Sequence, residues 1–159
     1  MRPDLRFLMS HPAHFVACGF GSGLSPRAPG TAGTLAAWAL FPLLAATLPE
    51  SLLLLILAIF FVLGIIVADR TGRDLGVSDH GAIVWDEMVP FWLVLVLTPP
   101  GLAWQALAFV LFRFFDIVKP PPVGWADSKV KGGFGVMLDD LIAAGYTLLV
   151  LALLKRTLE

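Results

Sequence analysis

The sequence predicts an all-α protein, an integral membrane helical bundle of about four to five short membrane helices. Of the 159 residues, 58% are hydrophobic and 14% are charged, whereas average soluble domains carry about 25% charged residues. A water-soluble fold of this length could not bury that much apolar surface. Apolar runs alternate with polar, glycine-rich segments. Backbone groups in lipid must be paired internally, so each apolar run is expected to be a helix.

Five apolar runs divide the chain. They cover residues 35–48, 52–68, 88–97, 102–112 and 141–154. Only the second run, which contains no charged residue, approaches the roughly 20 residues that span a bilayer. The other runs are expected to extend into their polar flanks, to enter the membrane partway, or to pack inside the bundle.

Breaks between the runs define the predicted connections. Residues 49–51 separate the first two runs, and the turn-forming residues 98–101 separate the third and fourth. Three prolines at 120–122 are expected to end the fourth helix just after Lys119. No internal repeat is visible, and one domain covering residues 1–159 is expected.

Basic residues are distributed unevenly among the connections. The two short turns contain none, whereas the N-terminal segment and the connections after the second and fourth runs contain several. Because basic connections favour the cytoplasmic side, two hairpins are predicted to enter the membrane from the cytoplasm. Lys155 and Arg156 are the exception, and they lie outside if the last helix crosses fully rather than tilting or inserting partway. Residues 1–18 lack the apolar core of a signal peptide, so the N-terminus is expected to be retained.

Charge and cysteine content exclude several classes of function. The formal net charge is −1, which gives no sign of nucleic-acid binding. Cys18 is the only cysteine, so an intramolecular disulfide and a thiolate metal cluster are excluded. A lone buried cysteine is the expected interpretation.

The first polar segment, residues 19–34, is rich in glycine and leads into an apolar run. Arg27, Thr31 and Thr34 lie near the expected helix start, where an N-terminus favours anions. Glycines let backbone N–H groups approach an anion closely. A flexible loop with a threonine N-cap is the simpler interpretation.

The second polar segment places two acids against a membrane run. Asp86 and Glu87 are adjacent, so on a helix they point about 100° apart, one toward a site and one toward a neighbouring helix. An ionised carboxylate at membrane depth is costly and is by default a functional candidate. A solvated helix start is the alternative. His80 either orients substrate and donates a proton or is an ordinary loop histidine.

Two further segments carry charged groups. Arg113, Asp116 and Lys119 have the spacing i, i+3, i+6, which puts them near one helix face, as a simple ion pair or as part of a phosphate site. Asp139 and Asp140 follow a glycine-rich stretch and are expected to open the last helix. Carboxylates with no cysteine set and no His-x-x-x-His pair favour Mg²⁺ over zinc.

In this order, between about residues 19 and 150, the four segments resemble the phosphatidylglycerophosphatase A family. The matching pieces are GSGLSP at 21–26, APGT at 28–31, GT at 33–34, DHG at 79–81, VWDE at 84–87, FRFFDI at 112–117, KP at 119–120, GGFG at 132–135 and MLDD at 137–140. The resemblance implies a magnesium-dependent phosphatase of the bacterial cytoplasmic (inner) membrane. It also implies phosphatidylglycerophosphate as the phospholipid substrate and phosphatidylglycerol as the product. The residues alone indicate only a membrane site for an anionic headgroup.

The expected site combines these groups. The catalytic residues are expected to be Asp86, Asp116, Asp139 and His80. The Mg²⁺ ligands are expected to be Asp86, Glu87, Asp139 and Asp140. The substrate phosphates are expected to bind Arg27, Thr31, Thr34, Arg113 and Lys119. The acids should converge from three helix ends on one pocket at the cytoplasmic boundary.

Two questions stay open at this stage. Water activated by the metal is the preferred nucleophile, and an aspartyl-phosphate is the alternative. The rival function is a small transporter or channel for an ion or anionic solute. That rival predicts polar residues throughout the membrane depth, whereas the run at residues 52–68 has no charge and the acids cluster at one end.

Overall fold

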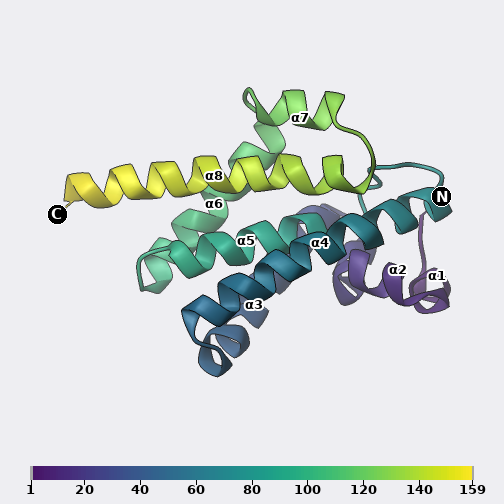
Figure 1. Ribbon diagram of the computed structural model, residues 1–159, viewed down its shortest axis with the longest axis horizontal. Helices are drawn as coiled ribbons and strands as arrows, with labels where there is room; N and C mark the ends of the chain where they lie inside the picture. The colour runs from purple at the N-terminus through teal and green to yellow at the C-terminus, as the bar shows by residue number, and fades with distance from the viewer. Residues whose placement is uncertain (1, 159) are drawn as a thin grey trace.

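The computed structural model describes residues 2–158, and within that range the chain is all-α with no strand (Figure 1). The elements are α1 (Leu5–Ser10), α2 (Pro12–Ala17), the 3-10 helix η1 (Gly19–Leu24), α3 (Pro29–Thr47), α4 (Glu50–Leu75), α5 (Trp85–Leu97), α6 (Leu102–Val118), α7 (Val123–Lys129) and α8 (Gly132–Leu158). The predicted fold class is confirmed. The short helices α1, α2, η1 and α7 were not expected.

Three helices of the described chain are long and apolar enough to cross a membrane. These are α3 with 19 residues, α4 with 26 and α8 with 27. Each continues past its apolar run into a polar flank, as the sequence indicated. The helices α5 and α6 are shorter, with 13 and 17 residues. Length and composition therefore support three of the four to five membrane helices that the sequence predicts.

Two helix starts differ from the prediction. The helix α3 begins at Pro29, a residue suited to the first helical position. Thr31 and Thr34 therefore lie inside α3, and the suggested threonine N-cap is wrong because Ala28 holds that position. The helix α8 begins at Gly132, so Asp139 and Asp140 lie about two turns inside it rather than at its start.

The predicted connections after α5 and α6 are confirmed, whereas the first break is shorter than residues 49–51 because α4 already begins at Glu50. Residues 98–101 separate α5 from α6, and α6 ends at Val118, where Lys119 adopts a left-handed conformation with φ 50°. In Figure 1 the α3–α4 turn, the α5–α6 turn and the C-terminus lie toward the left, and the N-terminal helices lie to the right. Glu50, Thr98 and Lys155 line one shared pocket, so α8 runs the full length of the bundle to the end that carries the hairpin turns.

The bundle core joins α4, α5 and α8, with α3 packed on α5 and α6 packed on α8. Met88, Phe91, Phe112 and Met137 are fully buried between these helices. The indole N–H of Trp92 donates to the Ala37 carbonyl at 2.8 Å, which ties α5 to α3. This packing fixes the first turns of α5 beside α3, α6 and α8.

The N-terminal helices are attached to the end of α4. His14 Nε2 lies 2.9 Å from Asp74 Oδ2, and the His14 ring stacks on Phe7. Cys18 is buried nearby, and burial raises the pKa of its thiol to about 11. The expectation of a buried cysteine is confirmed.

Candidate active site

The first turn of α5 presents two carboxylates in different surroundings. Asp86 is 5% exposed, and its Oδ1 has no hydrogen-bond partner among residues 2–158. Glu87 instead accepts hydrogen bonds from the Thr34 hydroxyl at 3.0 Å and from Arg113. The prediction that the two acids face different neighbours therefore agrees with the structure.

Glu87 belongs to a network that joins α3, α5 and α6. Nη1 of Arg113 binds the Glu87 carboxylate and lies 2.6 Å from Asp116 Oδ2. All three side chains are largely buried, and Arg113 Nε has no hydrogen-bond partner within the described chain. Buried charges are retained when they are paired and hydrogen-bonded. The pairing fixes the guanidinium while leaving one of its donors available.

Close helix packing makes room for this network. A Cβ added at Gly30, on the first turn of α3, would lie 2.1 Å from Glu87 Oε1. The Thr34 hydroxyl also lies 2.9 Å from the Gly30 carbonyl. Glu87 can occupy its place against α3 only because position 30 has no side chain.

A second network surrounds the amine of Lys119. Nζ of Lys119 lies 2.8 Å from Asp139 Oδ2 on α8 and 2.8 Å from Asp127 Oδ1 on α7. Burial opposes the charge of Lys119, but its hydrogen bonds to the two carboxylates hold its pKa above the ordinary value. Lys119 therefore does not continue the α6 face of Arg113 and Asp116. Its left-handed backbone directs it toward α7 and α8 instead.

Asp140 resembles Asp86 in its surroundings. It is 3% exposed, and its Oδ1 has no hydrogen-bond partner among residues 2–158. The charges of Asp86 and Asp140 interact with each other and with those of Asp116 and Asp139. The structure thus brings together carboxylates from α5, α6 and α8, although nothing local in the sequence requires it.

The carboxylates of the site could supply one or two ligands to a magnesium ion but not a complete ligand set. Within residues 2–158 no three histidine, cysteine or acidic side chains are arranged to hold a metal on their own. Magnesium usually binds through one or two carboxylates and keeps several waters or takes phosphate oxygens. The two unpartnered, buried oxygens of Asp86 and Asp140 match that demand, and a cation would offset the repulsion between them.

Three of the expected residues lie at the edge of these networks or apart from them. Arg27 is exposed in the loop before α3, and Thr31 is half-buried on the first turn of α3. His80 lines a cavity of about 290 Å³ together with Arg2, and its Nδ1 accepts a hydrogen bond from the Ala82 N–H at 3.1 Å. No carboxylate lines that cavity within the described residues.

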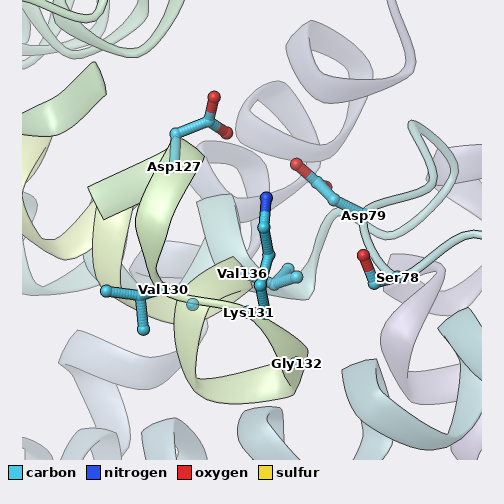
Figure 2. A pocket seen from close by; sticks show the side chains of 8 residues that line it. Ser78, Asp79, Asp127, Val130, Lys131, Gly132 and Val136 are labelled. Carbon is cyan, nitrogen blue, oxygen red and sulfur yellow. The ribbon is translucent and has the colours of Figure 1, made fainter. Parts of the chain in front are cut away.

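Sequence reasoning missed part of the Lys119 network. Asp127, Asp79 and Lys131 surround a small cavity of about 30 Å³ beside the start of α8, as Figure 2 shows. That volume is enough for about one water molecule. Asp127 lies on the short helix α7, whose seven residues carry no apolar run. The one sequence signal for its contact with Lys119 was its position eight residues further along the chain, just after the prolines.

Comparison with known proteins gives consistent matches over nearly the whole chain. A model of the phosphatidylglycerophosphatase A family matches residues 15–155. The phosphatidylglycerophosphatase A of Haemophilus influenzae is 45% identical over 150 residues, which cover 93% of this chain and 91% of that protein. The protein of the same name from Escherichia coli is 45% identical over 139 residues, covering 87% and 80%.

A third relative carries a different name. A candidate phosphatidylinositol-3-phosphatase of Bacteroides thetaiotaomicron is 41% identical over 147 residues, which cover 88% of this chain and 91% of that protein. No solved structure matches the chain.

Proposed function

Because the chain belongs to the phosphatidylglycerophosphatase A family and is a phosphatidylglycerophosphatase, we propose that it works as one magnesium-dependent membrane domain, residues 1–159. The substrate is phosphatidylglycerophosphate, which loses its terminal phosphate to give phosphatidylglycerol. The observation that supports this site is the convergence of carboxylates from α5, α6 and α8. Asp86 and Asp140 each carry an unpartnered oxygen in residues 2–158. Their sequence neighbours Glu87 and Asp139 bind Arg113 and Lys119, respectively.

In this proposal Asp86 and Asp140 hold the magnesium ion, with Glu87 and Asp139 beside them. The ion, when bound, neutralises charge on the phosphoryl oxygens. Glu87 and Asp139 are already bound to Arg113 and Lys119, respectively. Their proposed role is therefore to position those cations and to complete the ion's surroundings through water.

Arg113 and Lys119 bind the phosphate that is removed. Phosphoryl transfer depends mainly on positioning and on stabilising charge in the transition state. Arg113 has a buried, unpartnered Nε, and its orientation is fixed by Glu87 and Asp116. Thr34 supports this arrangement by donating to Glu87. Arg27 and Thr31, near the N-terminus of α3, bind the phosphate that remains in the product.

Water is the preferred nucleophile in the proposal. Asp116 accepts its proton as the water oxygen attacks phosphorus. The bond from phosphorus to the glycerol oxygen breaks, and His80 returns a proton to that oxygen. Attack by an aspartate, which gives an aspartyl-phosphate, is the alternative. Labelled phosphate trapped on the protein would contradict the water mechanism.

The site is proposed to face the cytoplasm from a multi-pass position in the bacterial inner membrane. The spans α3, α4 and α8 cross the bilayer, and the hairpin of α5 and α6 enters it beside them. Basic residues lie at the N-terminal helices, at the end of α4 and around α7, which favours the cytoplasm for that end. Lys155 and Arg156 then lie on the opposite side.

Phosphate release from purified protein tests the proposal. The substrates are phosphatidylglycerophosphate, phosphatidic acid and phosphatidylinositol 3-phosphate, each with Mg²⁺ and with chelator. The third lipid is included because of the name of the Bacteroides relative. Phosphatidylglycerophosphate should be hydrolysed fastest, and chelator should stop the reaction. Ion or solute flux in liposomes without phosphate release would favour the transporter instead.

A further inference from the structure

An apolar groove of about 390 Å³ lies between α4, α5 and α8. On α5 it is lined by Val89, Pro90 and Leu93. Together with Asp86, these residues have the spacing i, i+3, i+4, i+7, which defines one face of a helix. Asp86, whose Oδ1 has no hydrogen-bond partner among residues 2–158, therefore lies on the same face of α5 that forms one wall of the groove.

The opposite wall is a face of α4. Leu54, Ala58, Phe61 and Val62 line it, and they extend over about 12 Å of helix. The indole N–H of Trp85, the first residue of α5, donates to the Phe60 carbonyl at 3.0 Å. The Val62 end of the groove is therefore level with the start of α5, and the Leu54 end lies deeper in the bundle.

The remaining wall comes from α8. Leu141 lines the groove and directly follows Asp140, whose Oδ1 is the other buried, unpartnered carboxylate oxygen of the site. Every residue that lines the groove is hydrophobic. The groove is thus apolar along its whole lining, and its α5 wall begins about one helical turn from Asp86.

The geometry points to one acyl chain of the lipid phosphate as the occupant of this groove. This inference rests on the proposed function. A molecule that fills both the site and the groove must carry an anionic head and a hydrocarbon tail on one backbone, which describes a phospholipid. Lipid tails are about as apolar as the groove itself, so the groove gains little hydrophobic energy over the bilayer. Its role is to align the chain so that the attached headgroup reaches Asp86, Asp140 and Arg113.

Groove-filling variants and two substrates of different chain length test this inference. Ala58 and Val62 are exposed on the groove wall, so Ala58→Trp and Val62→Trp fill it without disturbing the core. Ala45→Trp, on the exposed surface of α3, is the matched control. Each full-length variant is assayed in detergent micelles with dioleoyl and dibutyryl phosphatidylglycerophosphate, and its elution in gel filtration is compared with that of the parent.

With the dioleoyl lipid, kcat/KM of both groove variants should fall about ten-fold, and with the dibutyryl lipid it should stay within about two-fold of the parent. The control should match the parent with both lipids. Equal losses with both lipids, or no loss with either, would overturn the inference.

A cross-linking measurement separates this inference from the proposed function. Phosphatidylglycerophosphate with a diazirine in one acyl chain should label peptides of α4 and α5 that line the groove, and Ala58→Trp should remove most of that label. Labelling that spreads over the outer surfaces of α3 and α6 and is unchanged by the variant would overturn the groove. Labelling of the groove without any phosphate release would support the acyl-chain groove and contradict the proposed function.

Discussion

Replacing Gly30 by alanine should lower kcat/KM strongly while lowering the free energy of unfolding only modestly. The added Cβ would lie 2.1 Å from Glu87 Oε1, well inside an ordinary contact of 3.4 Å or more. The Glu87 side chain must therefore retreat by roughly 1 Å, because the α3 backbone is held by its helix and cannot yield as cheaply. The movement breaks or lengthens the contacts of Glu87 with Thr34 and Arg113.

The consequences for rate and stability differ in size. A displacement of about 1 Å in a positioned catalytic group costs about 100-fold in rate, and we expect that loss in kcat/KM. One weakened hydrogen bond to a charged group costs about 1.5–3 kcal/mol, and alanine in place of glycine in a helix returns up to about 1 kcal/mol. The net loss of stability should therefore be about 0.5–3 kcal/mol.

The assay is phosphate release by the full chain in detergent, paired with thermal unfolding followed by circular dichroism. Gly145→Ala is the matched control, because its added Cβ meets nothing within 4 Å in the described structure. It should keep full activity and unfold at the same or a slightly higher temperature. A Gly30→Ala protein with parental kcat/KM would refute the idea that Glu87 positions Arg113 for catalysis.

Three further changes follow from the same geometry. Asp86→Asn should lower kcat at least about 100-fold yet raise the unfolding temperature in chelator, because it removes the unfavourable interaction of the Asp86 carboxyl with the neighbouring acids; full activity would remove Asp86 from the site. Lys119→Met should lower kcat/KM about ten-fold or more with gel filtration unchanged, and unchanged kinetics would make Lys119 purely structural. Arg113→Lys should lower kcat about 100-fold, because an ammonium cannot contact Glu87, Asp116 and a phosphate in the same planar arrangement, and a loss of less than about three-fold would contradict that role.

Hydrophobic runs and prolines were sufficient to predict most of the helices. The runs at residues 35–48, 52–68 and 141–154 became the cores of α3, α4 and α8, because apolar side chains and internal backbone pairing act locally. The helix starts were less predictable. Pro29 begins α3 two residues before Thr31, and Gly132 begins α8 within a glycine-rich segment that local preferences would make a loop.

The burial of acidic residues in the candidate site was expected from the sequence, and their partners were not. Asp86 and Asp140 attracted attention because buried charge in an apolar chain needs a reason. Which basic side chain each acidic residue contacts depends on the tertiary structure. Lys119 leaves the α6 face because its backbone is left-handed, and it meets Asp127 on a helix that has no hydrophobic signal. His80 and Arg27 were grouped with the site because a histidine can donate a proton and an arginine can bind an anion, and these properties do not specify distance.

The site divides into two parts with different electrostatics. Glu87, Arg113 and Asp116 form a paired group in which Arg113 Nε alone lacks a hydrogen-bond partner in residues 2–158, and ion pairs in a low-dielectric interior hold such a group rigid. Asp86 and Asp140 form the unsatisfied part, with one buried oxygen each that lacks a hydrogen-bond partner in residues 2–158. Natural proteins tolerate few such atoms, and those that persist need a specific reason. Under the proposed function, the stability lost at these oxygens in the free protein would be regained when a cation and a lipid phosphate bind together.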